Sequence, residues 1–211
     1  MLKTLKFAPF VVLSLSLLTG GAQGQTQPQI EKARETIAAL NGVENYCFSV
    51  QKFSETRQAR LFARVASSQG GPAKWMPFSS ESQWRTAGQP EPAAWTWQKD
   101  QRVVLVRITV ENGQDGFRYV DYCYDPNGKL ARVTTAPSTI THCDNRNFRC
   151  VVVSGTDWVF LPNGQKIPLE TRFDWSRLRS EQTVFVASEL NPAEYTEASD
   201  LPFANLLTRR F

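Results

Sequence analysis

Residues 102–134, RVVLVRITVENGQDGFRYVDYCYDPNGKLARVT, decide the fold of this chain. The stretch begins with a nearly continuous run of β-branched and other apolar residues, which is typical of a strand buried on both faces. Segments rich in Gly, Asn and Asp follow at 111–116 and 125–129, and residues of these types allow a chain to reverse. The pattern therefore predicts three consecutive antiparallel strands joined by two turns.

The second reversal, DPNGK at 125–129, is the strongest turn signal in the chain. Proline sets φ at the first turn position, and Gly128 suits the left-handed conformation that rejoins the strand pairing through a bulge. The segment DYCYDPNG at 121–128 is matched by DWVFLPNG at 157–164. Two copies are fewer than a repeat architecture needs, so we favour two independent hairpins with one kind of turn over an ancestral duplication.

The flanking segments predict additions to this sheet. Residues 28–40 have the apolar spacing of an amphipathic helix, and Asn41-Gly42 is a typical helix end. Residues 67–92, rich in Gly, Pro and Ser, predict a long irregular loop. We also expect strands at 46–53, 57–66 (which also fits a short helix), 94–98, 148–153, 157–161, 166–174 (at an edge or bulge because of Pro168) and 183–187, and a short helix near Pro202.

Residues 1–24 are typical of a cleaved export signal, with Lys3 and Lys6 before an apolar run at 7–18. This run is shorter than the roughly 20 residues that span a bilayer, so we expect no transmembrane anchor. The mature chain is expected to be soluble and either periplasmic or extracellular. Loss of the two lysines lowers the net charge from +4 to 22 − 20 = +2, which is too small to indicate binding to nucleic acid or anionic lipid.

The four cysteines all lie in the exported part, and an even number in an oxidising compartment favours two disulfides. Three pairings are possible. Cys143 and Cys150 bracket a short polar loop and are the natural local pair, which leaves Cys47 for Cys123. The chain-entropy model assigns the short bridge about 2.5 kcal/mol and the long bridge about 4.5 kcal/mol.

These elements predict one α+β domain, mainly antiparallel β. The N-terminal helix, within residues 25–42, is expected to pack on a meander or half-barrel-like sheet formed by 43–211, as one domain with it. An exported chain with this order of elements resembles the periplasmic lipoprotein-carrier family in topology, over residues 29–50 and the later meanders. That resemblance implies an apolar groove that holds acyl chains.

The residue types of catalytic and metal sites are sparse. His142 is the single histidine and lies beside Cys143, but adjacent residues on an extended segment point to opposite sides and do not form a nucleophile–base pair. The cysteines lack the spacing of a zinc knuckle, and no phosphate loop or GxGxxG occurs. We therefore expect neither a cofactor nor a metal, and favour a non-catalytic protein.

A pair of acids supports a different hypothesis. Asp121 and Asp157 occupy equivalent positions before the two Pro-Asn-Gly turns. A glycosidase needs two carboxyl groups across a sugar, whereas acids beside hairpins more commonly bond to turn backbone or face solvent. A hydrolase that uses these two residues is the second alternative function.

Four of the six tryptophans, Trp75, Trp84, Trp95 and Trp97, lie in the irregular loop or just after it. Exposed aromatic rings there would stack on sugars or receive apolar ligands, whereas buried rings would cap the core. The favoured hypothesis is an exported, non-catalytic binding or envelope-associated module that contacts an unknown apolar or carbohydrate ligand through these four residues. The first alternative is a carrier of a lipid or acyl chain in a half-barrel groove.

Overall fold

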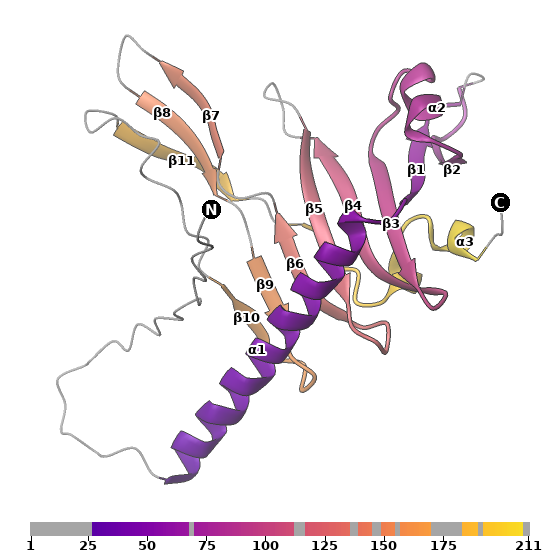
Figure 1. Ribbon diagram of the computed structural model, residues 1–211. Helices are drawn as coiled ribbons and strands as arrows, with labels where there is room; N and C mark the ends of the chain where they lie inside the picture. The colour runs from indigo at the N-terminus through magenta and orange to yellow at the C-terminus, as the bar shows by residue number, and fades with distance from the viewer. Residues whose placement is uncertain are drawn as a thin grey trace, which may run out of the picture.

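The computed structural model of the chain describes residues 27–67, 70–111, 117–135, 139–144, 149–154, 157–169, 183–189 and 192–208. The expected export signal at 1–24 lies outside them. Within the described residues, a long helix precedes a larger and a smaller β-sheet, and short helices flank the larger sheet (Figure 1). The helices are α1 (Gln27–Glu55), α2 (Glu81–Thr86), the 3-10 helix η3 (Ala198–Asp200) and α3 (Ala204–Leu207).

The larger sheet has eight antiparallel strands in the order β10-β9-β6-β5-β4-β3-β1-β2, and it is open rather than closed into a barrel. Its strands are β1 (Arg60–Val65), β2 (Lys74–Phe78), β3 (Ala93–Lys99), β4 (Arg102–Glu111), β5 (Phe117–Tyr124), β6 (Leu130–Thr135), β9 (Asp157–Phe160) and β10 (Lys166–Pro168). In the smaller sheet, β8 (Arg149–Ser154) pairs antiparallel with β7 (Thr139–Asp144) and parallel with β11 (Thr183–Glu189). The predicted α+β fold, a helix on an antiparallel meander, is confirmed.

The central meander is confirmed as β4, β5 and β6, which pair in chain order. All four residues from Val103 to Val106 are buried. Layers of side chains lie on both sides of β4, which explains why its apolar run is nearly continuous instead of alternating.

Both Pro-Asn-Gly segments form the same turn, as predicted. Gly128 and Gly164 have φ values of 80° and 84°, a left-handed conformation that glycine adopts without steric cost. The amide of Asp125 donates to the Lys129 carbonyl at 2.8 Å, and the amide of Leu161 donates to the Gln165 carbonyl at 2.9 Å. A register shift in the β5–β6 pairing follows at Ala131, beyond the bulge predicted at Gly128.

The predicted end of the first helix is wrong. α1 continues through Gly42 to Glu55, so the strand expected at 46–53 is helical. Residues Leu40, Cys47 and Val50 fall on one helical face and are buried against the sheet, whereas Phe48 is 56% exposed. Packing of this longer apolar face outweighs the cost of one helical glycine, about 1 kcal/mol.

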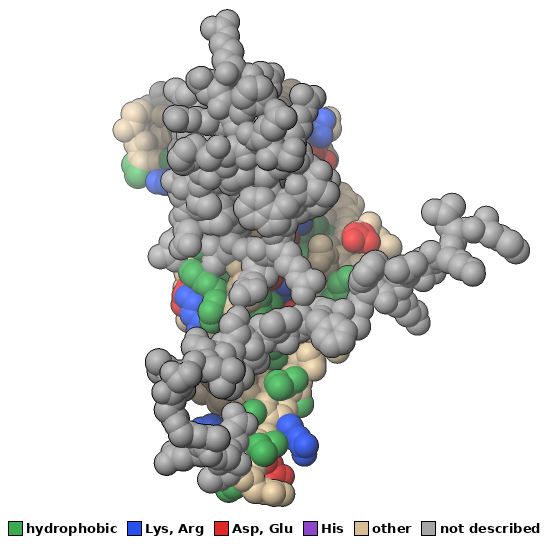
Figure 2. Space-filling model, turned by 90° about the vertical axis from the view of Figure 1, so that its left-hand side faces the viewer, with side chains coloured by type: hydrophobic (Ala, Val, Ile, Leu, Met, Phe, Trp, Pro, Cys, Tyr) green, Lys and Arg blue, Asp and Glu red, His purple; other side chains and the backbone are tan. Residues whose placement is uncertain are grey.

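The two faces of the larger sheet carry different layers. α1 crosses one face diagonally over β9, β6, β5 and β4 (Figure 1). The C-terminal segment, residues 192–208, covers the other face, where the Phe203 ring stacks on Phe62 at 5.1 Å and meets Trp75 at 4.8 Å. Leu201 and Leu206 are buried beside it. The first turns of α1 extend past the sheet and expose apolar and charged side chains, at the lower end of Figure 2.

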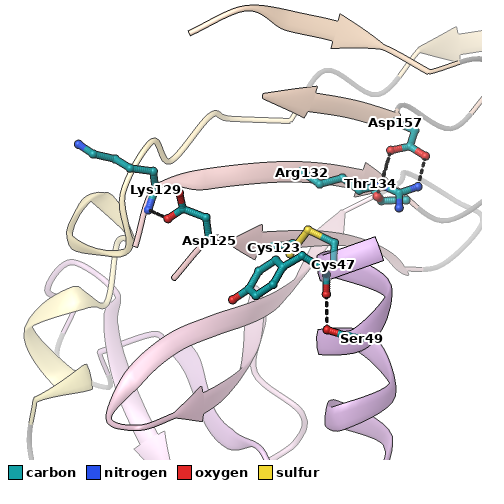
Figure 3. Close-up of a disulfide and its surroundings, with 9 residues drawn as sticks. Cys47, Ser49, Cys123, Asp125, Lys129, Arg132, Thr134 and Asp157 are labelled. Atoms are coloured by element: carbon teal, nitrogen blue, oxygen red, sulfur yellow. Dashed lines mark hydrogen bonds and ion pairs between the residues drawn. A yellow bond between two sulfur atoms is a disulfide. The ribbon is translucent and has the colours of Figure 1, made fainter. Parts of the chain in front are cut away.

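A disulfide joins Cys47 of α1 to Cys123 of β5, with the Cα atoms 5.9 Å apart (Figure 3). The predicted pairing of these two residues is confirmed, although the bond links a helix to a strand rather than two strands. In the β7–β8 register Cys143 lies opposite Cys150. The side chains of that second expected pair lie outside the described part of the chain.

The other expected elements are present with small shifts. Within residues 57–66 the chain forms the strand β1 rather than a helix, and the expected strands at 94–98, 157–161 and 166–174 appear as β3, β9 and the shorter β10. The irregular stretch contains two short elements, β2 and α2. The two outermost strands each contain a proline, Pro77 in β2 and Pro168 in β10, so the expected edge position of Pro168 is confirmed.

Candidate functional site

The structure separates the four tryptophans that the sequence grouped into one site. Trp84 and Trp95 lie on the α1 side of the sheet with their rings 5.5 Å apart, and Trp95 also contacts Tyr119 at 5.9 Å. Trp84 is buried, and its indole Nε1 donates to the Pro90 carbonyl at 3.0 Å. These rings pack α2 against the sheet.

Trp97 also lies on the α1 side, at the C-terminal end of the helix. Its indole Nε1 donates to the Arg57 carbonyl at 3.1 Å, and its ring packs beside Phe53 against the residues around the disulfide. Trp97 and Phe53 line an open hollow of about 540 Å³ whose other side chains are polar or charged. Trp97 therefore shares no site with Trp84 and Trp95.

Trp75 lies on the opposite face, at a cavity with a volume of about 620 Å³. β4 and β5 form its floor, β1, β2 and the loop before β3 form one wall, and the C-terminal segment forms the other wall. The lining residues are Arg64, Trp75, Glu91, Pro92, Ile108, Thr109, Val110, Val120, Tyr122, Pro192, Ala193, Tyr195 and Pro202.

The alternation of side chains along β4 and β5 determines which residues form the floor of this cavity. Ile108 of β4 lies opposite Val120 of β5, and the next residues with the same orientation are Val110 and Tyr122. The Tyr122 ring lies 5.3 Å from that of Tyr195 in the C-terminal segment. The floor is thus apolar, and an aromatic pair joins it to the wall.

The polar groups of the cavity are few. Arg64 lies opposite Trp75 in the β1–β2 register and is exposed to solvent. Burial raises the pKa of Tyr122 and, more weakly, that of Tyr195, and the charge of a neighbouring phenolate would add to the effect at Tyr122. Both hydroxyls therefore stay neutral at physiological pH and offer hydrogen bonds rather than charge.

Sequence reasoning found only Trp75 among these lining residues. The alternation in β4 and β5 was a usable signal for Ile108, Val110, Val120 and Tyr122. The segment at 192–202 gave no such signal, because its prolines and polar residues follow no helical or strand period.

The two acids before the turns each bind an arginine. Asp121 accepts two hydrogen bonds from Arg107, both at 2.7 Å. Asp157 accepts two from Arg132, at 2.8 and 2.5 Å, and a third from the Thr134 hydroxyl at 3.3 Å (Figure 3). The carboxylates raise the pKa of Arg107 and of Arg132 through these hydrogen bonds.

Both acids lie on the α1 side of the sheet. Thr134 lies between them in the register, opposite Asp121 on one side and Asp157 on the other. Two strand spacings put their Cα atoms about 9.6 Å apart. Each carboxylate is thus fixed by its own guanidinium, an arrangement that fastens β4 to β5 and β6 to β9.

The described residues contain no group of three His, Cys, Asp or Glu side chains placed to hold a metal ion. The side chain of His142, in β7, lies outside the described part of the chain. Among the described helices, none combines the length and the apolar character needed to cross a membrane.

The described disulfide is a bond that forms and persists in oxidising compartments. No match was found when the chain was compared with protein-family models, with curated proteins and with solved structures.

Proposed function

We propose that this chain is a non-catalytic binding protein that holds a small, mostly apolar molecule in the cavity beneath residues 192–208. The observation that carries the proposal is the cavity itself. Its volume of about 620 Å³ is typical of sites for small ligands, which are concave, lined by apolar and aromatic side chains and furnished with a few polar groups.

The composition of the walls favours an apolar body for the ligand. Aliphatic side chains form the floor, and the rings of Trp75, Tyr122 and Tyr195 stand around it. Removing apolar surface from water contributes roughly 25 cal/mol per Å². Aromatic walls also order a bound molecule at little entropic cost, because their side chains are already packed.

The position of the cavity distinguishes this proposal from a carrier that wraps its sheet around a helix. The interface between α1 and the sheet is filled by its own side chains, among them Leu40, Cys47 and Val50. The cavity lies on the face that α1 does not cover. A ligand would therefore be enclosed by the C-terminal segment and not by the N-terminal helix.

We also propose that the chain acts outside the cytoplasm, after export and cleavage near Gly24. The export pattern at 1–24 and the Cys47–Cys123 disulfide support this location. Intact-mass measurement of the exported chain should show loss of these residues. An uncleaved, reduced chain in the cytoplasm would contradict the proposal.

Filling the cavity tests the binding function. The probe is N-phenyl-1-naphthylamine, an uncharged dye that fluoresces in apolar sites. Val110→Phe places a ring in the cavity, whereas Val65→Phe adds the same ring at another partly buried strand position that does not line it. We expect binding to the wild type and to Val65→Phe, and at least about tenfold weaker binding to Val110→Phe. No binding to the wild type, or equal binding by all three, would reject the site.

A further inference from the structure

We propose that the ligand of this cavity is an amphiphile with an anionic end, and that the guanidinium of Arg64 binds the anion at the rim. The inference rests on the proposed function, because it names the class of molecule that the same cavity takes. It follows from the position of Arg64 in the cavity wall and from a comparison with other arginines of the sheet.

Arg64 differs in its contacts from three other arginines of the sheet. Arg60 donates to two carbonyls at the end of α3, at 2.7 and 3.2 Å, and Arg107 and Arg132 each hold a carboxylate. Among the described contacts of Arg64, only its backbone amide is engaged, with the Pro92 carbonyl at 2.9 Å. Its guanidinium thus retains its donors for a ligand.

Among the lining residues, Glu91 carries the charge opposite to that of Arg64. Glu91 takes part in an interaction of its own, and no ion pair joins it to Arg64 in the described residues. Tyr122 and Tyr195 are uncharged, since burial raises the pKa of each phenol. The positive charge at the rim is therefore local to Arg64, whose guanidinium makes no ion pair within the described residues.

The geometry divides the cavity into a polar rim and an apolar floor. Arg64 is exposed and faces Trp75 across the β1–β2 pair, whereas Ile108 and Val120 are buried in the sheet. A planar guanidinium offers two parallel donors that fit a carboxylate or a phosphate. A ligand that spans both regions would place its charged end beside Arg64 and its apolar end on the sheet.

The volume sets the length of the apolar end. At about 30 Å³ for each water displaced, 620 Å³ corresponds to roughly 20 waters. Each water has one heavy atom, and a twelve-carbon chain with a small head group has fewer than about 20 heavy atoms, so it fits this volume. Dodecanoate, dodecyl phosphate and 1-dodecanol are therefore suitable probes, since they share one chain and differ in the end group.

The experiment measures displacement of the bound dye by each probe, below its micellar concentration, for the wild type, Arg64→Gln and Arg85→Gln. Arg85 is an exposed arginine of α2 outside the cavity, so its variant controls for the loss of one charge. The wild type and Arg85→Gln should bind at least one of the two anionic probes about tenfold or more tightly than dodecanol. Arg64→Gln should bind all three probes equally and retain the dodecanol affinity.

The outcomes separate the two proposals. Equal binding of dodecanol and both anions by the wild type would overturn the anionic-ligand inference and leave the apolar site standing. A preference for the anion that survives Arg64→Gln would overturn the role of Arg64. Failure of all three probes and of the dye would overturn the proposed function itself. If the wild type prefers the anionic probes, the probe that binds more tightly shows whether the natural head group is a carboxylate or a phosphate.

Discussion

The two faces of the eight-stranded sheet are built in different ways. On one face, α1 is held by a covalent bond and by side chains that fill the interface, including Cys47, Val50 and Leu105. On the other face, the C-terminal segment is buried at Phe203 and Leu206 but leaves a cavity beside Tyr195. The interface with α1 is therefore filled by side chains, whereas the other face also has room for a ligand.

The difference originates in the alternation of a single strand. Tyr122 and Cys123 are neighbours in β5, yet the first lines the cavity and the second is bonded to α1. A mutation on one face should therefore affect the contacts of that face more than those of the other.

Removing the disulfide should have the largest effect. The bond closes a separation of 76 residues, for which the chain-entropy model gives about 4.5 kcal/mol. We expect Cys47→Ala/Cys123→Ala to lose about this much free energy of unfolding in urea titration. The folded fraction should still bind the dye, because the cavity lies on the opposite face. A loss below about 1 kcal/mol would show that α1 is held by packing alone.

On the cavity face, the corresponding change shortens the side chain of Phe203. Phe203 is completely buried between Phe62 and Trp75, and Phe203→Ala should cost about 3 kcal/mol and also weaken dye binding. Phe48→Ala, at an exposed phenylalanine of α1, is the matched control and should change stability by less than about 0.5 kcal/mol. Unchanged dye binding in folded Phe203→Ala would mean that the segment does not shape the cavity.

The smallest effect concerns Tyr124. Its buried hydroxyl has no hydrogen-bond partner among the described residues. At pH 7, Tyr124→Phe should therefore leave the stability unchanged or raise it by up to about 1 kcal/mol. Thermal unfolding of the two proteins measures the difference. A destabilised variant would indicate a partner for the hydroxyl.

The burial of Tyr124 also predicts that the free energy of unfolding depends on pH. Burial raises the pKa of Tyr124 and of Tyr122 above the ordinary value of 10.0, so each phenol favours folding only while it is protonated. Their contribution is complete below pH 10 and is lost as the pH rises from 10 towards the folded pKa, by up to about 1.4 kcal/mol per pH unit for each phenol. Tyr124→Phe should remove one of these two losses.

Local patterns predicted the sheet well because its strands are decided by local chemistry. The apolar run of β4 and the two turns at Gly128 and Gly164 carry their own conformational preferences. The end of α1 was missed for the opposite reason. Residues 46–53 fit a strand locally, and only contacts with distant strands, together with the bond to Cys123, favour the helix.

The candidate site was harder to predict because it joins segments far apart in the chain. Trp75 and Tyr195 lie on opposite walls of one cavity, and neither sequence context indicates the other. The clustering of tryptophans in the sequence suggested one ligand site. Strand alternation and α2 instead direct Trp84, Trp95 and Trp97 to the α1 side. The cysteine pair was predictable, since an oxidised chain with few cysteines allows few pairings.

The prolines in the two outermost strands have a consequence for how the protein behaves in a crowded compartment. An unpaired strand exposes amide and carbonyl groups that would recruit a strand from another molecule. Pro77 in β2 and Pro168 in β10 each remove one such amide, and Lys74 and Lys166 place positive charge on the same two strands. Each border is thus a poorer template for a strand of another molecule than an edge without proline.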